Sequence, residues 1–161
     1  GGRTCDVAAR RNLGGRQSAL FAVPSRSAVM QIDYAAACSV ALATSDPPRK
    51  VSKQCFNLFP KMREIDAVMT PLLQERVFEC HPELAFTFMN GERPLHEPKK
   101  VKSRPYGPGL VLRRALLAKS GIPARLLDAT RAGMTGVGED DILDALACAW
   151  SARRSLHPRA I

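Results

Sequence analysis

The sequence lacks the features that mark membrane-spanning and secreted proteins. No apolar run approaches the roughly 18 residues that a helix needs to cross a bilayer. The first residues, Gly1-Gly2-Arg3, include no Met and no basic segment followed by an apolar one, so they do not read as a signal peptide. We therefore expect no membrane association, and the N-terminus looks like the cut edge of a longer chain.

Paired cysteines and the common nucleotide and hydrolase motifs are also missing. The five cysteines, Cys5, Cys38, Cys55, Cys80 and Cys148, are odd in number and scattered, and no two have the CxxC spacing of zinc or redox sites. This usage favours a reduced, cytoplasmic setting. There is no GxxxxGK[ST] phosphate loop, no GxSxG nucleophile elbow and no GxGxxG fingerprint.

The composition that remains is that of one basic globular domain over residues 1–161. Hydrophobic residues make up 45% and charged residues 24% of the chain, which excludes an intrinsically disordered protein. Basic residues number 24 against 15 acidic ones, and the net charge of +9 favours polyanionic partners, nucleic acid first. The alternative is that the charge serves solubility alone.

Hydrophobic spacing and turn residues predict a mostly helical chain. We expect helices over residues 4–13, 32–44, 83–89, 110–119, 124–132 and 139–154. Another helix begins at Pro60 and carries one apolar stripe through Met62, Ile65, Met69 and Leu72. Residues 77–80 are the best strand candidate, and residues 93–108 read as a basic loop.

The helix over residues 139–154 carries three acids on the side opposite its apolar face, Asp140, Asp141 and Asp144. Asp141 and Asp144 are neighbours on a helix surface, and adjacent carboxylates favour a bound cation such as Mg²⁺ or Mn²⁺. Acids in a first turn also stabilise the helix dipole, which is the preferred interpretation for Asp140. Small residues beside Asp144 favour a functional role there.

Three further residues could take part in catalysis or binding. Glu83 follows the strand candidate, as a metal ligand or general base, or as a first-turn acid after Pro82. Lys99 and Lys100 could clamp phosphates, although a solvated charge run is the commoner explanation. Zinc is not expected, because no second His accompanies His81 at ligand spacing.

Several blocks follow one another along the chain: Cys5-Asp6 with Ala9-Arg10-Arg11, Val51-Ser52-Lys53-Gln54, Phe59-Pro60-Lys61-Met62-Arg63-Glu64-Ile65-Asp66, His81-Pro82-Glu83, Asn90-Gly91, Lys99-Lys100 and Asp140-Asp141-Ile142-Leu143-Asp144-Ala145-Leu146. In this order they resemble the domain-of-unknown-function family 429, predicted to be nucleases with an RNase H-like fold. The resemblance implies an α/β RNase H-like fold, truncated here at the N-terminus so that the chain is mostly helical with few strands.

The resemblance also implies a function. Glu83, Asp141 and Asp144 would bind Mg²⁺ or Mn²⁺ and catalyse phosphodiester hydrolysis by a divalent-metal-dependent nuclease, with Lys99 and Lys100 facing the substrate backbone. Members of the family carry two strands ahead of the first block, so we expect this chain to lack them and one central metal-binding Asp.

Two other functions fit the same residues. One is a non-catalytic nucleic-acid-binding or scaffold domain, and the other is the handling of a phosphorylated small molecule. The sequence has no signal for oligomeric state or for DNA against RNA.

Overall fold

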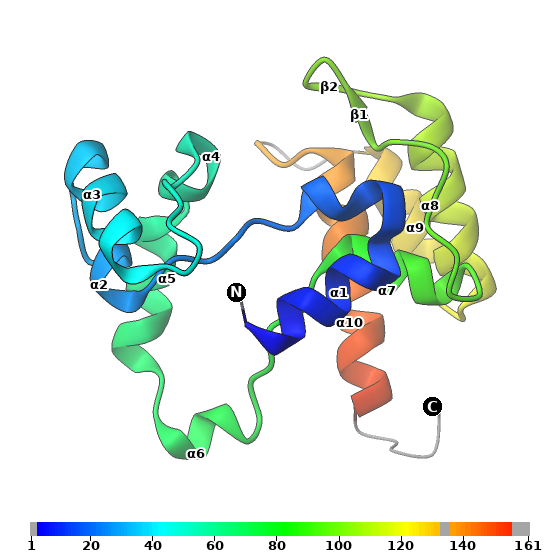
Figure 1. Cartoon of the computed structure of the whole chain (residues 1–161). Coiled ribbons are helices and arrows are strands. Elements are labelled where there is room, and N and C mark those ends of the chain that lie inside the picture. Colours follow the sequence, from blue (N-terminus) through cyan, green and yellow to red (C-terminus); the bar gives the residue numbers. More distant parts are fainter. Residues whose placement is uncertain (1–2, 133–135, 156–161) are drawn as a thin grey trace. The chain divides into compact units, whose positions relative to one another are not determined.

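The computed structural model describes residues 3–132 and 136–155 (Figure 1). The chain divides into two compact units. Unit 1 comprises Gly1–Ala8 and Leu20–Glu79, and unit 2 comprises Ala9–Ala19 and Cys80–Ile161. Helix α1 (Thr4–Leu13) contributes residues to both. In the described ranges, no helix has the length and apolar character needed to cross a membrane.

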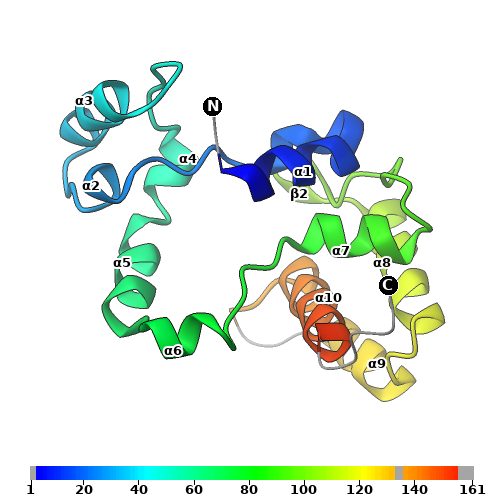
Figure 2. The same ribbon diagram turned by 60° about the horizontal axis from the view of Figure 1, so that its bottom comes forward.

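Unit 1 is built from short helices that begin at polar caps. They are α2 (Arg26–Val29), α3 (Tyr34–Thr44), α4 (Lys53–Phe56), α5 (Phe59–Val68) and α6 (Pro71–Gln74), which Figure 2 shows in chain order. The side chains of Ser25, Asp33, Ser52 and Thr70 accept hydrogen bonds from backbone N–H groups in the first turns of α2, α3, α4 and α6. The buried cluster comprises Ala28, Val29, Ala37, Cys38, Ala41, Val51, Cys55 and Phe59.

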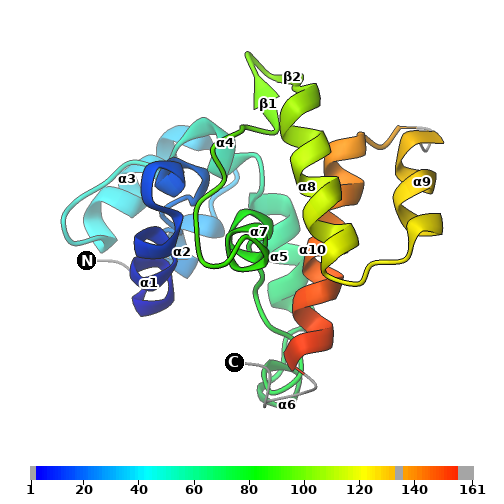
Figure 3. The same ribbon diagram turned by 90° about the vertical axis from the view of Figure 1, so that its right-hand side faces the viewer.

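Unit 2 is organised around the long helix α10 (Glu139–Ser155), which packs against α7 (Pro82–Met89), α8 (Gly107–Lys119) and α9 (Ala124–Ala132) (Figure 3). A 3-10 helix, η1 (Gly14–Ala19), also belongs to it. The buried cluster comprises Ala85, Phe86, Leu95, Leu110, Leu116, Leu117, Leu127, Leu143 and Ala147. This separate core is what fixes the site described below.

A short antiparallel hairpin precedes α8. Strand β1 (Lys100–Val101) pairs with β2 (Arg104–Pro105), with Lys100 opposite Pro105 and Val101 opposite Arg104. Its two turn residues, Lys102 and Ser103, have φ values of 50° and 63°. Positive φ at both central residues is the geometry of a tight two-residue hairpin turn. The hairpin extends past the N-terminal end of α8, as Figures 1 and 3 show.

Most of the predicted helices are confirmed. Helix α1 has the predicted bounds, as does α9, and α10 runs one residue further than expected. Helix α3 begins at Tyr34, two residues late, because Asp33 is its N-cap. Helix α8 begins at Gly107, three residues early, in part of the segment expected to be a loop.

Three predictions about local structure are wrong. Residues 77–80 form no strand; Val77 and Phe78 are exposed, and the described residues offer them no partner strand. The helix that starts near Pro60 ends at Val68, because Thr70 and Pro71 begin a new helix, α6. The hairpin lies where a loop was expected. The RNase H-like fold itself stays a prediction, since the described residues contain only this two-stranded sheet.

Candidate functional site

Six charged side chains of unit 2 lie together, and we refer to them as the charge cluster. They come from the start of α7, the start of the hairpin, the middle of α8 and the first turns of α10: Glu83, Lys99, Lys100, Arg113, Asp140 and Asp144. The packing of α10 against α7 and α8 holds these elements in place. All three carboxylates of the cluster have a basic partner.

Arg113 is the most buried member of the charge cluster, with a relative exposure of 0%. Its Nη2 donates to both carboxylate oxygens of Glu83, at 2.7 and 2.9 Å. Its Nη1 donates to the backbone oxygens of Glu97 and Gly109, at 3.1 and 3.0 Å. Arg16 adds a second positive charge, with its Nε 3.8 Å from Glu83 Oε1. Glu83 is therefore a buried structural anion in this arrangement, held by arginine on both oxygens.

Two carboxylates of α10 pair with Lys99 and Lys100, where the hairpin begins. Asp144 accepts a hydrogen bond from Lys99, whose Nζ also lies 3.7 Å from Asp140 Oδ2. Lys100 Nζ lies 2.7 Å from the same Asp140 oxygen. Asp140 is 2% exposed, whereas Asp141 is exposed. The structure thus brings Asp140 and Asp144 together around lysine and leaves Asp141 at the surface.

The charges in the cluster influence one another. Burial raises the pKa of Asp144 above its usual value, and attraction to Lys99 and Arg113 offsets only part of that rise. Arg113 thereby acts on two acids, because it pairs directly with Glu83. The interaction with Asp140 raises the pKa of Lys100, so Lys100 stays protonated at neutral pH.

A glycine allows the loop that carries the lysines to lie against α8. A Cβ atom on Gly109 would lie 1.8 Å from the backbone oxygen of Pro98 and 2.6 Å from its carbonyl carbon. No side chain fits at that distance. The backbone N–H of Tyr106 also donates to Lys99 O at 2.9 Å, which closes the base of the hairpin. These two contacts position Lys99 and Lys100 in front of α10.

The positive charges at the tip of the hairpin differ from those of Lys99 and Lys100 in their surroundings. Lys102 and Arg104 are exposed, and within residues 3–132 and 136–155 neither has an acidic partner. The segment contains no aromatic side chain. A hairpin of this composition attracts phosphate groups but offers no surface on which bases stack.

The three predicted catalytic residues thus lie in different environments. Glu83 pairs with Arg113, Asp144 pairs with Lys99, and Asp141 is exposed. Among the described residues, no group of three His, Cys, Asp or Glu side chains could hold a metal ion. As arranged, these acids do not fit a ready site for Mg²⁺ or Mn²⁺, and their catalytic and metal-binding roles stay predictions.

Arg113 and Arg16 were missed at the level of sequence. Arg113 had one available signal: it lies three residues after Leu110 and four before Leu117, on the apolar side of α8. A lone arginine in an apolar stripe indicates a buried partner of opposite charge. Arg16 had no such signal, because its contacts are with Glu83, Leu95 and His96, all far away in the sequence.

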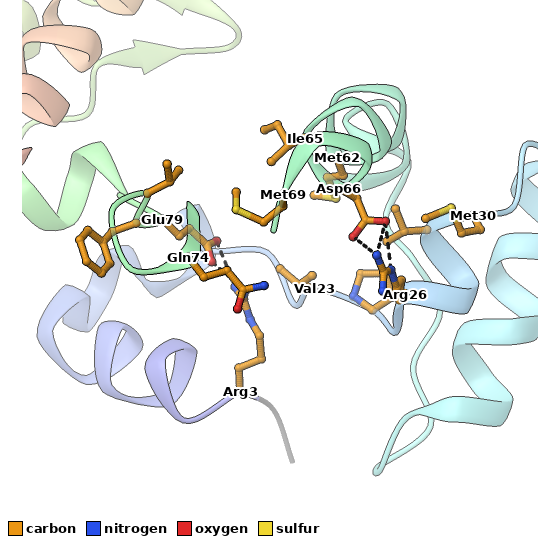
Figure 4. A pocket seen from close by; sticks show the side chains of 14 residues that line it. Arg3, Val23, Arg26, Met30, Met62, Ile65, Asp66, Met69, Gln74 and Glu79 are labelled. Carbon is orange, nitrogen blue, oxygen red and sulfur yellow. Dashed lines mark hydrogen bonds and ion pairs between the residues drawn. The ribbon is translucent and has the colours of Figure 1, made fainter. Parts of the chain in front are cut away.

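Unit 1 contains a cavity of about 740 Å³ that is mainly apolar (Figure 4). Figure 4 shows two ion pairs among its lining residues, between Arg26 and Asp66 and between Arg3 and Glu79, each with a shortest distance of 2.7 Å. The apolar lining comprises Val23, Pro24, Val29, Met30, Met62, Ile65, Met69, Val77 and Phe78. Because the charges are already paired, this cavity presents no reactive group.

Comparison with known proteins gives one match. A family model described as Protein of unknown function (DUF429) matches residues 1–160. No curated protein and no solved structure matches the chain.

Proposed function

The chain belongs to the family described as Protein of unknown function (DUF429), and from the surface chemistry of unit 2 we infer that it binds nucleic acid. The contacts would run through the hairpin and go to the phosphate backbone, without reading base sequence. The observation that carries the proposal is the pair of unpartnered cations, Lys102 and Arg104, at the tip of a hairpin whose base is fixed on α8 and α10.

The distribution of charge between the units supports this proposal. Unit 2 contains 16 of the 24 basic residues and 8 of the 15 acidic ones, whereas the charges of unit 1 almost balance at 8 and 7. Nearly all of the net charge of +9 therefore belongs to unit 2. A polyanion is attracted to that unit before any specific contact forms.

The charge cluster has a supporting role in this function. Asp140 and Asp144 hold Lys99 and Lys100 against α10, so that the first strand of the hairpin starts from a fixed position. The same carboxylates reduce the positive charge available from these two lysines. The predicted substrate contacts of Lys99 and Lys100 would therefore be weaker than those of Lys102 and Arg104.

The first test removes the two cations at the hairpin tip. With Lys102→Ala and Arg104→Ala combined, we expect the affinity for a 20-base-pair DNA at low salt to fall about tenfold. The slope of log affinity against log salt should become shallower by about 2, because two phosphate contacts are lost. Fluorescence anisotropy at several salt concentrations measures both quantities.

The matched control is the double variant Arg49→Ala with Lys50→Ala, which removes two exposed charges from unit 1. It should leave the salt slope unchanged. If both double variants lowered affinity equally, net charge and not the hairpin would drive binding, and the proposal would fail. It would also fail if wild type bound neither DNA nor RNA at low salt.

The divalent-metal-dependent nuclease is the second candidate, and one observation favours it. The ammonium group of Lys99 lies between the carboxylates of Asp140 and Asp144, so one cation already occupies that space. Oxygen ligands of this kind are those that Mg²⁺ and Mn²⁺ prefer. Lysine therefore competes with the metal for these two acids, and Glu83 would have to leave Arg113 to join them.

Calorimetric titration with Mn²⁺ distinguishes this candidate from simple nucleic-acid binding. If the nuclease is correct, Lys99→Ala should bind Mn²⁺ more tightly than wild type, because the competing cation is gone, and Asp144→Ala should lose binding and cleavage. Unchanged Mn²⁺ binding and cleavage in Asp144→Ala would contradict it.

The cytoplasm remains the expected compartment, in keeping with the five free cysteines.

A further inference from the structure

The cavity of unit 1 has the size of a small-molecule site. Every residue that lines it belongs to this one unit, and α2, α5 and α6 all contribute (Figure 4). Its volume of about 740 Å³ lies within the range of roughly 300–1,000 Å³ that ligand pockets occupy. The lining comprises 14 residues, whereas each side of a stable protein–protein interface comprises roughly 20–30. The cavity therefore fits a small molecule better than a protein partner.

The wall of the cavity is made mainly of flexible apolar side chains. Three of the five methionines of the chain line it, Met30, Met62 and Met69. Met62 and Met69 are half-buried, whereas Met30 is 42% exposed. Methionine is unbranched and has three rotatable bonds, so it adapts its shape to different apolar surfaces. An apolar ligand that removes this wall from water is stabilised by the hydrophobic effect.

The charges in the lining cancel one another. Arg3 donates to both carboxylate oxygens of Glu79, at 2.7 and 3.1 Å. Arg26 donates twice to one oxygen of Asp66, at 2.7 and 3.0 Å. Arg3 also donates to both oxygens of Asp6, at 2.8 and 3.1 Å. An anionic ligand would have to displace one of these carboxylates from its arginine, which opposes its binding.

Gln74 is the uncharged polar side chain of the lining. It is exposed, and its amide has no hydrogen-bond partner in the parts of the chain that the structure describes. A side-chain amide both donates and accepts hydrogen bonds, so it matches a hydroxyl or a carbonyl group. The lining thus offers one polar contact beside an apolar wall.

We propose that this cavity is a binding site for an uncharged apolar small molecule that carries one hydroxyl or carbonyl group, such as a medium-chain alcohol. The apolar part of the ligand would contact the three methionines, and its polar group would bond to Gln74. Arg3 and Arg26 would stay with their carboxylates, so fatty acids would be excluded. The hairpin and the charge cluster belong to unit 2, so this binding goes beyond the proposed nucleic-acid function.

The first experiment titrates the folded full chain with the neutral fluorescent probe N-phenyl-1-naphthylamine. We expect its emission to rise on binding, and octan-1-ol to displace it at a concentration about tenfold lower than octanoate at neutral pH. Octanoate that displaces the probe as well as octan-1-ol would overturn the proposal, because an arginine would then have left its carboxylate. A probe that does not bind would also overturn it.

Two positions of α5 provide a matched pair of variants. Ile65 lines the cavity and is 57% exposed, whereas Val68 is 65% exposed and is not among the lining residues. Ile65→Lys should weaken probe binding about tenfold, because an ammonium group would face the apolar ligand. Val68→Lys should leave binding unchanged. An equal loss in both variants, with circular dichroism showing that both are folded, would contradict the proposed site.

Nuclear magnetic resonance of the wild-type chain with isotope-labelled methionine methyl groups locates the ligand without any substitution. Octan-1-ol should shift the methyl signals of Met30, Met62 and Met69. Met89 packs against the core of unit 2 and is the internal control. Shifts confined to Met89 would place the ligand elsewhere and refute the proposal. Because the hairpin contributes no residue to this cavity, such a result would leave the proposed nucleic-acid binding unaffected.

Discussion

Arg113 carries a positive charge at a position where almost none of its side chain reaches solvent. Burying such a charge is costly unless it is paired and hydrogen-bonded. Glu83 supplies the opposite charge, and two backbone carbonyl groups accept further hydrogen bonds. The pair joins α7 to α8, and through its effect on Asp144 it also influences α10. Removal of the Arg113–Glu83 pair should therefore destabilise unit 2 as a whole.

We predict that Arg113→Met destabilises the protein by about 3–5 kcal/mol, because Glu83 would remain buried without its partner. Arg16, 3.8 Å from Glu83, limits the loss to the lower part of that range. Urea unfolding followed by circular dichroism measures the free energy of unfolding. The double variant Arg113→Met with Glu83→Leu should recover roughly 2 kcal/mol, because no charge is then left unpaired. A double variant less stable than the single one would contradict this account.

The elements that could be predicted from sequence are those whose signals are local. Helices α1, α7, α9 and α10 were predicted to within one or two residues at each end, because their caps and apolar spacing lie in the segment itself. Residues 77–80 show the limit of this reasoning. Their apolar residues resemble a strand, but a strand requires a partner, and pairing is not a property of the segment.

For the candidate site, single residues could be predicted from sequence, but their contacts could not. Asp144, Asp140 and the two lysines were identified individually, since acids on one helix face and a basic run are visible in sequence. That Lys99 lies between the two acids depends on the hairpin and on the close approach of Pro98 to Gly109, which are long-range contacts. The contacts of Arg113 and Arg16 are long-range in the same way and arise only in the fold.

At the scale of the whole molecule, the residues that the structure describes form two separate buried clusters, one in each unit. The length predicts one domain, and that stays a prediction; each cluster draws its residues from one unit alone. A cluster with its own helices loses its stability when its largest side chain is removed. Phe59 is that side chain in unit 1, and Leu143 is a fully buried member of the cluster in unit 2.

We predict that Phe59→Ala, at a cost of about 3–5 kcal/mol, abolishes amide hydrogen-exchange protection in α3 and α5 and leaves protection in α7, α8 and α10 intact. Nucleic-acid binding should persist in this variant, because the hairpin and its supports belong to unit 2. Leu143→Ala, at about 2–5 kcal/mol, should weaken protection in α7, α8 and α10 and lower binding with it. Hydrogen exchange with and without DNA measures both effects. Loss of protection in α10 on Phe59→Ala would show instead that the two clusters unfold as one cooperative domain.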